Sequence, residues 1–252
     1  MIKFFRKIRQ KMLTENKLSN YMFYAVGEIV LVVIGILIAL QLNNYNDTLK
    51  QEKQEMKTLQ NLKLDFEFNL SEMEKNINTL ENSKKTGLKI INQTGSKFSD
   101  NFSIDGLIDQ ITYTPVYFPQ NGFLLELVSS GNLGIISNEI LRNRLSSWFP
   151  TLETLKDKEQ LSLEFNKYLI LYIVKNGSWL NADKMTTDEQ IREISFPESG
   201  FKIDNSEMLK SPEFENLVEN QIVNQTILRE RQERCIKLNK EIINLLDFEI
   251  KK

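Results

Sequence analysis

An uninterrupted apolar run near the N-terminus is the strongest pattern in the chain. From Met22 to Leu42, 21 positions in all, only Glu28 and Gln41 are neither apolar nor small. About 20 such residues are enough for a helix to cross the hydrocarbon core of a bilayer. Tyrosines at both ends of the run stand where aromatic side chains meet the two lipid–water interfaces. The pattern predicts a transmembrane helix over residues 21–45.

Two later segments repeat apolar residues at intervals of three and four, the spacing of one helix face. Neither glycine nor proline interrupts residues 36–86 or 213–252. Ser211 and Pro212 suit the N-cap and first position of the second helix. We expect the two helices to pair antiparallel through their apolar stripes. The stripes contain Leu49, Met56, Leu59, Phe66, Leu70, Met73, Ile77 and Leu80 in the first helix, and Phe214, Leu217, Val218, Ile222, Leu228, Cys235, Leu238, Ile242, Leu245 and Ile250 in the second.

Most glycines and prolines lie in the central residues 87–200. Gly131 suits the left-handed position after a helix, Ser137 can cap the next one, and Pro150 is expected to end it. The expected elements are helices over residues 123–130, 139–149 and 151–175, and a Pro-rich turn over 113–122 that could include one extended stretch. The predicted fold is therefore all-α. It has an N-terminal transmembrane helix, a long helical-hairpin stalk in which the first and last helices pair, and a helical head at the far end.

The charge distribution predicts the orientation in the membrane. Residues 1–20 carry a net charge of +5 in a chain of net charge −2, so the remainder carries −7. Positively charged flanks stay in the cytoplasm. We predict a cytoplasmic segment (1–20), a single inner-membrane span (21–45) and an exported periplasmic domain (46–252). A cleaved signal peptide is the alternative. It is disfavoured because the run exceeds the usual ~7–15 residues and no A-x-A site follows.

The segment Ile2–Leu13 alternates as an amphipathic helix, with phenylalanines on one face and cations on the other. Such a helix lies along the lipid surface with its cations near anionic headgroups. The alternative is a basic tail that only sets the topology. A basic tip on an acidic body is not typical of nucleic-acid binding, so no nucleic acid is expected as a partner. The cations predicted to contact lipid are Lys3, Arg6, Lys7, Arg9 and Lys11.

Two stretches resemble a known family. "MIKFFRKIRQKMLTENKLSNYMFYAVGEIVLVVIGILIALQLNNYN" (residues 1–46) is very similar to the N-terminal signature of a family of uncharacterised single-span membrane-anchored proteins common in Bacteroidota. "FLLELVSSGNLGIISNEILRNRLSSWF" (residues 123–149) is more loosely similar to that family's helix–Gly–helix centre. The family is a domain of unknown function. The resemblance therefore implies a location and a domain layout, and it supplies no catalytic residues.

Glu28 shares one stripe of the predicted transmembrane helix with Gly35 and Ala39. Small residues four apart let two helices approach closely in lipid, and a carboxyl in the membrane should face protein or be neutral. Glu28 could hydrogen-bond between copies of this chain, pair with a cation of another membrane protein, or accept protons in an ion-driven machine. It could also extend towards water at the cytoplasmic side. We favour the first of these roles, in a homo-oligomer.

The composition excludes several kinds of chemistry. The chain has no histidine and one cysteine, Cys235, so Ser-His and Cys-His catalysis, His/Cys zinc sites and internal disulfides are impossible within it. Cys235 falls on the apolar stripe of the last helix and is expected to be buried. Tyr117, Phe118, Trp148 and Phe149 could line a ligand pocket, but such clusters are more often core. No cofactor, metal site or catalytic residue is predicted.

The predicted function is that of a non-enzymatic, membrane-anchored periplasmic protein. It would act by self-association or by binding another membrane protein. The alternatives are a periplasmic sensor or ligand-binding module, and an ion-coupled motor-like subunit that uses Glu28. A Glu28→Gln change separates the first and last ideas, because it should leave oligomer packing nearly unchanged and abolish proton-dependent activity.

Overall fold

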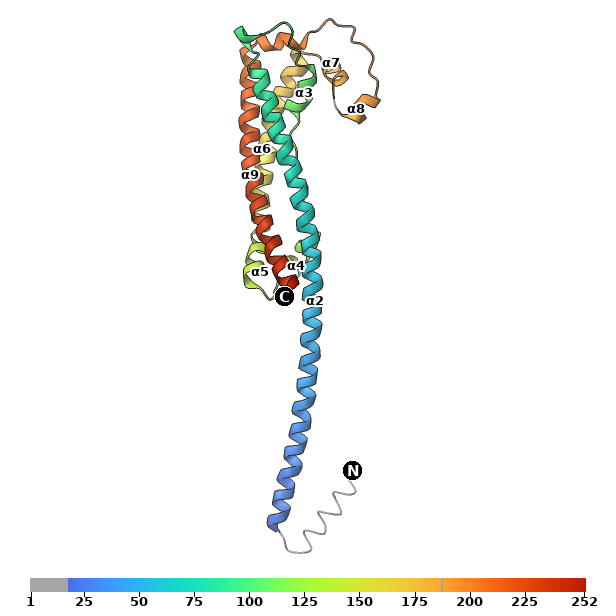
Figure 1. The fold of residues 1–252 in the computed structure, drawn as a ribbon, viewed down its shortest axis with the longest axis vertical. Helices are drawn as coiled ribbons and strands as arrows, with labels where there is room; N and C mark the ends of the chain where they lie inside the picture. The colour runs from blue at the N-terminus through green and yellow to red at the C-terminus, as the bar shows by residue number, and fades with distance from the viewer. Residues whose placement is uncertain (1–17, 187) are drawn as a thin grey trace. The chain divides into compact units, whose positions relative to one another are not determined.

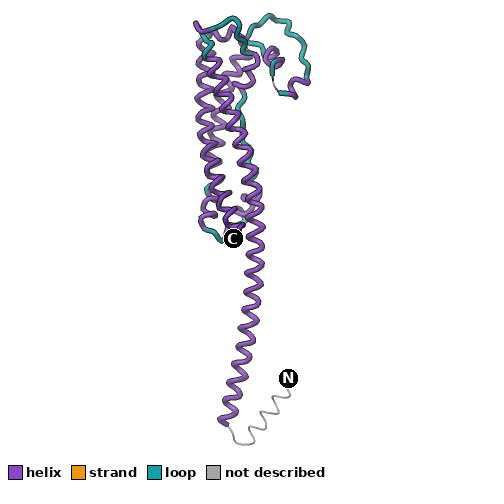
Figure 2. The backbone as a smooth tube through the Cα atoms, viewed as in Figure 1, coloured by secondary structure: helices purple, strands orange, loops and turns teal. Residues whose placement is uncertain are grey.

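The computed structural model describes residues 18–186 and 188–252, and within them it has helices, turns and irregular segments but no strand. Figure 2 shows how far helix dominates this part of the chain. The all-α prediction is confirmed. The cations predicted to contact lipid, Lys3, Arg6, Lys7, Arg9 and Lys11, lie outside the described residues. The cytoplasmic segment therefore stays a prediction.

The chain divides into two compact units, of which the first ends at Lys57 and the second comprises Thr58–Lys252. Helix α2 (Leu18–Ile91) contributes to both units and remains helical through the polar residues 43–47. The apolar side chains in the first unit have little cover. Phe23 is 78% exposed and Leu31 is 71% exposed.

Three long helical segments form the body of the second unit. They are the part of α2 from Thr58 onward, α6 (Trp148–Asn176) and α9 (Pro212–Lys251), which lie side by side in Figure 1. Side-chain links join α2 to α9 in antiparallel order, so the predicted pairing of the first and last helices is confirmed. The links are Lys63–Asp247 (2.6 Å), Glu74–Lys240 (2.9 Å) and Glu81–Arg229 (2.6 Å), and just after the end of α2 the Thr94 hydroxyl donates to Glu215.

Helix α6 also runs antiparallel to α9. The Lys158 ammonium donates to the Asn224 side-chain oxygen (2.9 Å), and the Cys235 sulfur lies 3.8 Å from the Thr151 carbonyl oxygen. Cys235 is buried, as predicted. The start of α9 is also as predicted, because the Ser211 hydroxyl accepts from the Phe214 N–H and a proline occupies the first turn.

A fourth leg of the bundle is only partly helical. It consists of α3 (Asp105–Thr112), an extended segment over residues 113–121, and α4 (Gly122–Ser129). The chain then turns through η2 (Asn132–Ile135) and α5 (Glu139–Ser146). In Figure 1, α4 and α5 lie near the C-terminus, at the opposite end of the unit from α3.

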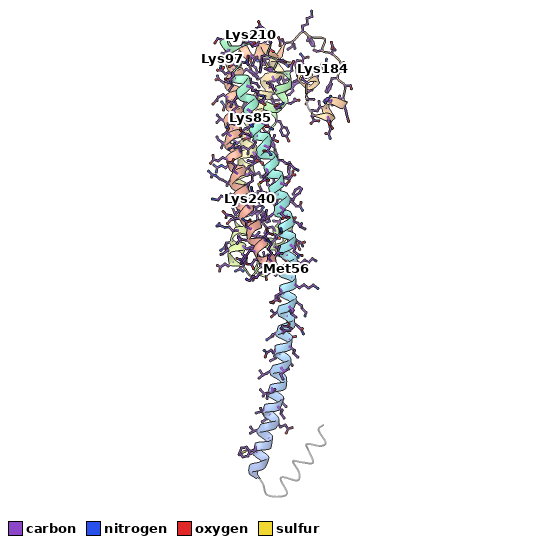
Figure 3. The ribbon with its side chains drawn as sticks, in the orientation of Figure 1. Met56, Lys85, Lys97, Lys184, Lys210 and Lys240 are labelled. Carbon is purple, nitrogen blue, oxygen red and sulfur yellow. The ribbon has the colours of Figure 1, made fainter. Side chains whose placement is uncertain are left out.

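The remaining short elements lie at the α3 end. They are η1 (Gly95–Lys97), α7 (Trp179–Lys184), α8 (Glu189–Glu193) and η3 (Asn205–Lys210). Figure 3 shows Lys97 and Lys210 together at this end, where the Lys210 ammonium lies 5.3 Å from the centre of the Phe98 ring. The buried Asn205 joins two of these segments. It donates to the Asp105 carboxylate and accepts from the Ser178 N–H, each over 2.6 Å.

The central residues differ from the expectation in their arrangement. They do not gather at the far end of a two-helix stalk, because α6 packs along α9 as a third long helix. Pro150 does not end a helix. It occupies the first turn of α6, where a missing N–H leaves no hydrogen bond unmade. Asn138, not Ser137, caps α5 by accepting from the Leu141 N–H. Gly131 has the predicted left-handed backbone, with φ of 72°.

Buried positions on the long helices recur mostly at intervals of three and four residues, but many of them are polar. On α9 the buried polar residues are Gln221, Asn224, Gln225, Gln232 and Asn239. On α2, Leu70 and Ile77 of the expected stripe are only half-buried, whereas Asn69 and Ser83 are buried. The periodicity in the sequence located the helices correctly, but the buried face is rotated towards polar residues.

Candidate functional site

The core of the second unit has two apolar clusters, with buried polar side chains interspersed along the same helices. One cluster surrounds Phe66 and Trp148, whose rings meet edge to face at 5.0 Å, and the other surrounds Phe214 and Ile108. Polar residues in a core need hydrogen-bond partners, since burying them without one costs free energy. The buried polar side chains include Asn69, Ser83, Thr86, Glu159, Ser162, Asn166, Gln221, Gln225, Gln232 and Asn239.

The extended segment of the fourth leg explains why several of these polar residues are buried. A single extended segment has no neighbouring strand, so its backbone N–H and C=O groups must pair with side chains. All three long helices supply such partners. Asn69 on α2 both donates to and accepts from Gln120, over 2.9 and 2.7 Å. In the extended segment, Gln225 also donates to the Tyr113 carbonyl (3.2 Å) and Glu159 accepts from the Tyr117 N–H (2.9 Å). At the last turn of α3, where carbonyls have no partner within the helix, Asn166 donates to the carbonyl of Thr112 (2.5 Å) and Gln221 to that of Ile111 (3.1 Å).

Glu159 on α6 is the most perturbed carboxyl of the described core. Burial raises its pKa to about 7, and the hydrogen bond from the Tyr117 N–H offsets part of that rise. Gln232 lies close enough to lower this pKa slightly, but within the described chain its amide makes no hydrogen bond of good geometry. Burial also raises the pKa of the nearby Cys235 thiol to about 11, so this cysteine is a poor nucleophile.

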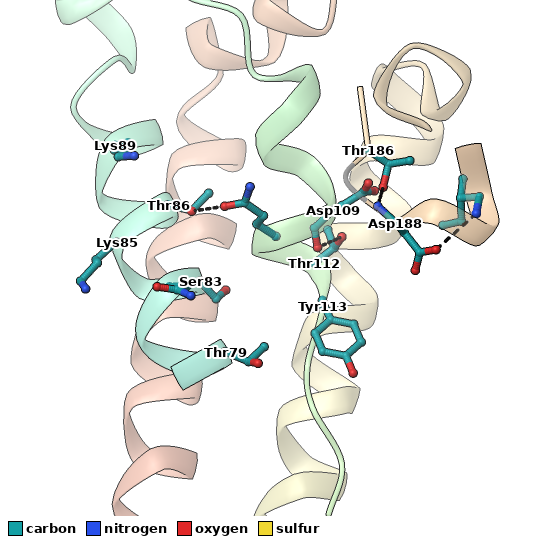
Figure 4. Close-up of a pocket in the computed structure, with 13 residues that line it drawn as sticks. Thr79, Ser83, Lys85, Thr86, Lys89, Asp109, Thr112, Tyr113, Thr186 and Asp188 are labelled. Atoms are coloured by element: carbon teal, nitrogen blue, oxygen red, sulfur yellow. Dashed lines mark hydrogen bonds between the residues drawn. The ribbon is translucent and has the colours of Figure 1, made fainter. Parts of the chain in front are cut away.

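A cavity of about 760 Å³ opens beside the junction of α3 with the extended leg (Figure 4). This volume falls in the range of small-molecule sites. Helix α2 forms one wall, and α3 with the chain around α8 forms the other. The described lining is Thr79, Asn82, Ser83, Lys85, Thr86, Lys89, Asp109, Gln110, Thr112, Tyr113, Thr186, Asp188 and Ile191.

Hydrogen bonds fix parts of this lining. The Thr86 hydroxyl donates to the Gln110 side chain across the two walls (2.8 Å), and the Thr112 hydroxyl donates to the Ile108 carbonyl (2.7 Å). The Thr186 hydroxyl accepts from the Asp188 N–H (3.2 Å). Among the described residues, no cluster of histidine, cysteine or acidic side chains could hold a metal ion. The cavity is therefore built for hydrogen bonding and for charge.

The residues that the sequence singled out are not part of this cavity. Trp148 and Tyr117 are buried in the core, and Phe118 is 80% exposed, so the aromatic cluster is split between core and surface. The sequence did not indicate this cavity, because the residues that line it come from three segments that are far apart in the chain. One signal was present: Thr79, Ser83 and Thr86 place three hydroxyls on one face of a helix at intervals of four and three.

Glu28, Gly35 and Ala39 lie on α2 in the first unit. Glu28 is partly exposed, Gly35 and Ala39 are exposed, and no side chain or other helix approaches within 4 Å of a Cβ built on Gly35. Their role in helix packing stays a prediction. Within the described residues, one helix is long and apolar enough to cross a membrane. Its most apolar window has a mean hydropathy of 2.5 and is 0% buried, unlike a core helix of a soluble protein.

Comparison with known proteins gives one match. Searches of curated proteins and of solved structures find nothing similar. The sequence profile of a family of unknown function (DUF6090) matches residues 28–154, which cover the later part of the apolar run, the rest of α2, the extended leg and the start of α6. The chain therefore belongs to this family of unknown function.

Proposed function

We propose that this protein is a single-span inner-membrane protein whose helical bundle lies in the periplasm and acts by self-association or by binding another membrane protein. The observation that carries the proposal is the uncovered apolar surface of α2. Exposed apolar side chains around all sides of this first part of the helix are costly in water and favourable in lipid. The resemblance of residues 1–46 to membrane-anchored proteins common in Bacteroidota supports the same location.

The orientation follows from the positive charge that precedes the span. A net charge of +5 in residues 1–20 favours retention of this end in the cytoplasm, which would export residues 46–252. The bundle then provides a folded surface outside the cell's cytoplasm, tethered to the membrane by one helix. This layout suits a protein that presents or recognises a partner at the membrane surface.

The topology can be tested with reporters fused after Lys252. A reporter that is active only outside the cytoplasm should be active, and a reporter that needs the cytosol should be silent. The protein should also stay with the membrane pellet after alkaline carbonate washing. The opposite reporter pattern would refute the orientation, and release by carbonate would refute the span.

A further inference from the structure

The cavity beside α3 contains buried polar atoms that the described chain leaves without hydrogen bonds. The Ser83 hydroxyl belongs to a residue that is 2% exposed and makes no hydrogen bond, although it lies on the side of α2 that faces α3 in Figure 4. One carboxylate oxygen of Asp109, on the opposite wall, is also buried without a partner. Each such atom costs stability, and the cost is larger for a charged group. Both residues with a missing hydrogen bond line the same cavity.

The charges of this cavity are divided between its walls. Lys85 and Lys89 belong to α2, whereas Asp109 belongs to α3 and Asp188 to the start of α8. One oxygen of the Asp188 carboxylate, Oδ1, already accepts from two backbone N–H groups at the start of α8. Asp109 has no such use. It lies close to a second carboxylate, since the pKa of Asp183 is raised by burial and then by the charge of Asp109. The Asp109 side of the cavity therefore favours a positively charged group.

The other lining residues limit the ligand further. Ile191 is the single purely apolar side chain in the described lining, so a purely apolar ligand would leave the polar groups of the cavity without hydrogen bonds. A neutral saccharide would leave the charge of Asp109 uncompensated. A ligand with a cation at one end and an anion at the other would match both walls, and the hydroxyl and amide side chains between them could pair with peptide groups.

We propose that this cavity binds a small zwitterion, an amino acid or short peptide, with its ammonium group on Asp109 and its carboxylate towards Lys89. The volume of about 760 Å³ accommodates more than one residue. Ser83 lies in the buried floor of the cavity. This inference does not depend on the proposed membrane function, because all the lining residues belong to the second unit.

Calorimetric titration of the full chain in detergent micelles tests the proposal, with trialanine as the probe. Trialanine should bind, and N-acetyl-trialanine and trialanine amide should each bind about tenfold more weakly or worse, because each lacks one terminal charge. Asp109→Asn should weaken trialanine binding by about tenfold or more, and Lys89→Gln by a smaller factor. Asp157→Asn, an exposed carboxylate on α6 outside the cavity, is the matched control and should bind like the parent.

Several outcomes would overturn the assignment. Maltotriose binding as tightly as trialanine would indicate a saccharide site, and equal binding of the capped and free peptides would remove the role of the charges. No binding of any probe at about 10 mM would exclude this ligand class at any useful affinity. The capped peptides test the parent protein, so the result stands even where a variant folds poorly. None of these outcomes bears on the reporter pattern that tests the membrane topology.

Discussion

Single residues in the core of the bundle have to serve two needs. They must fill positions on the buried face of a long helix, and they must supply hydrogen bonds to a fourth leg whose extended segment has no strand beside it. Asn69, Asn166 and Gln225 do both, because each is buried at a seam position and each pairs with the backbone of the fourth leg. An apolar residue at any of these positions would leave a buried backbone group unpaired.

Glu159 gives the bundle a stability that depends on pH. Its pKa is raised to about 7 in the folded protein, above the ordinary value of 4.5, so the folded state holds this proton more tightly than the unfolded state. The contribution of this proton to the free energy of unfolding is complete below about pH 4.5 and is lost as the pH rises through about 7. We expect the free energy of unfolding to fall by about 1–3 kcal/mol between pH 5 and pH 8.

Glu159→Gln should remove most of this fall, because the amide stays neutral and its oxygen can still accept from the Tyr117 N–H. Denaturant melts across the pH range would measure the effect. Glu153→Gln, an exposed position on the same helix, should keep the pH dependence of the parent. A parent protein whose stability is flat from pH 5 to pH 8 would show that Glu159 is not buried as described.

At the scale of elements, α2 is one helix with two different surfaces. Before Lys57 its apolar side chains are exposed, and after Thr58 it buries a seam against α9 and the fourth leg. Gly87 shows how close that packing becomes, since a Cβ built there would lie 2.6 Å from the Ile222 side chain. The first part of α2 needs lipid or another helix as cover, and the second part has protein.

The stripe of Glu28, Gly35 and Ala39 predicts how the span would pair with a second copy. Gly35→Leu should weaken self-association of the Met1–Tyr45 segment in a membrane two-hybrid assay, because a bulky side chain holds two helices apart. The loss should be partial, since such contacts are worth about 1–2 kcal/mol. Val33→Leu lies away from the stripe and should not change the signal. Equal signals from both variants would assign Glu28 to a different partner.

The seam of α9 can be tested in the same chain. Ile242 is fully buried in the apolar cluster with Phe66 and Leu246, so Ile242→Asp would bury an unpaired charge. We expect a loss of about 3–5 kcal/mol in the free energy of unfolding. Phe248→Asp, at a position that is 63% exposed on the same helix, should cost little. Similar melting of both variants would contradict the packing of this seam.

At the scale of the whole molecule, the second unit encloses its own core and the first does not. Both apolar clusters and the described cavity are made from residues after Thr58. A fragment of residues 47–252 should therefore be soluble without detergent, helical by circular dichroism, and cooperative in its thermal melt. A fragment that is insoluble or that melts without a transition would show that the bundle needs the span or a partner to fold.

The sequence by itself determined the local features of this protein. The apolar run, the all-α class, the cap at Ser211, the turn at Gly131 and the pairing of the first and last helices all follow from short-range patterns and from the need to bury one helix face. The absence of helix over residues 113–121 could also be predicted, because prolines and glycine interrupt a helix, but the sequence indicated a turn there and the structure has an extended segment.

Only the tertiary structure decided which polar residues are buried and which segments form the cavity. Asn69 and Ser83 look like surface positions when only the apolar stripe is considered. Asn69 is buried because the extended segment lies against α2, and Ser83 is buried on the side of α2 that faces α3. Asp109, Ser83 and Thr186 are far apart in sequence, and they line one cavity because three segments meet at one end of the bundle. Helical periodicity reports how each helix divides into faces, but it carries no information about which distant backbone will need those side chains as partners.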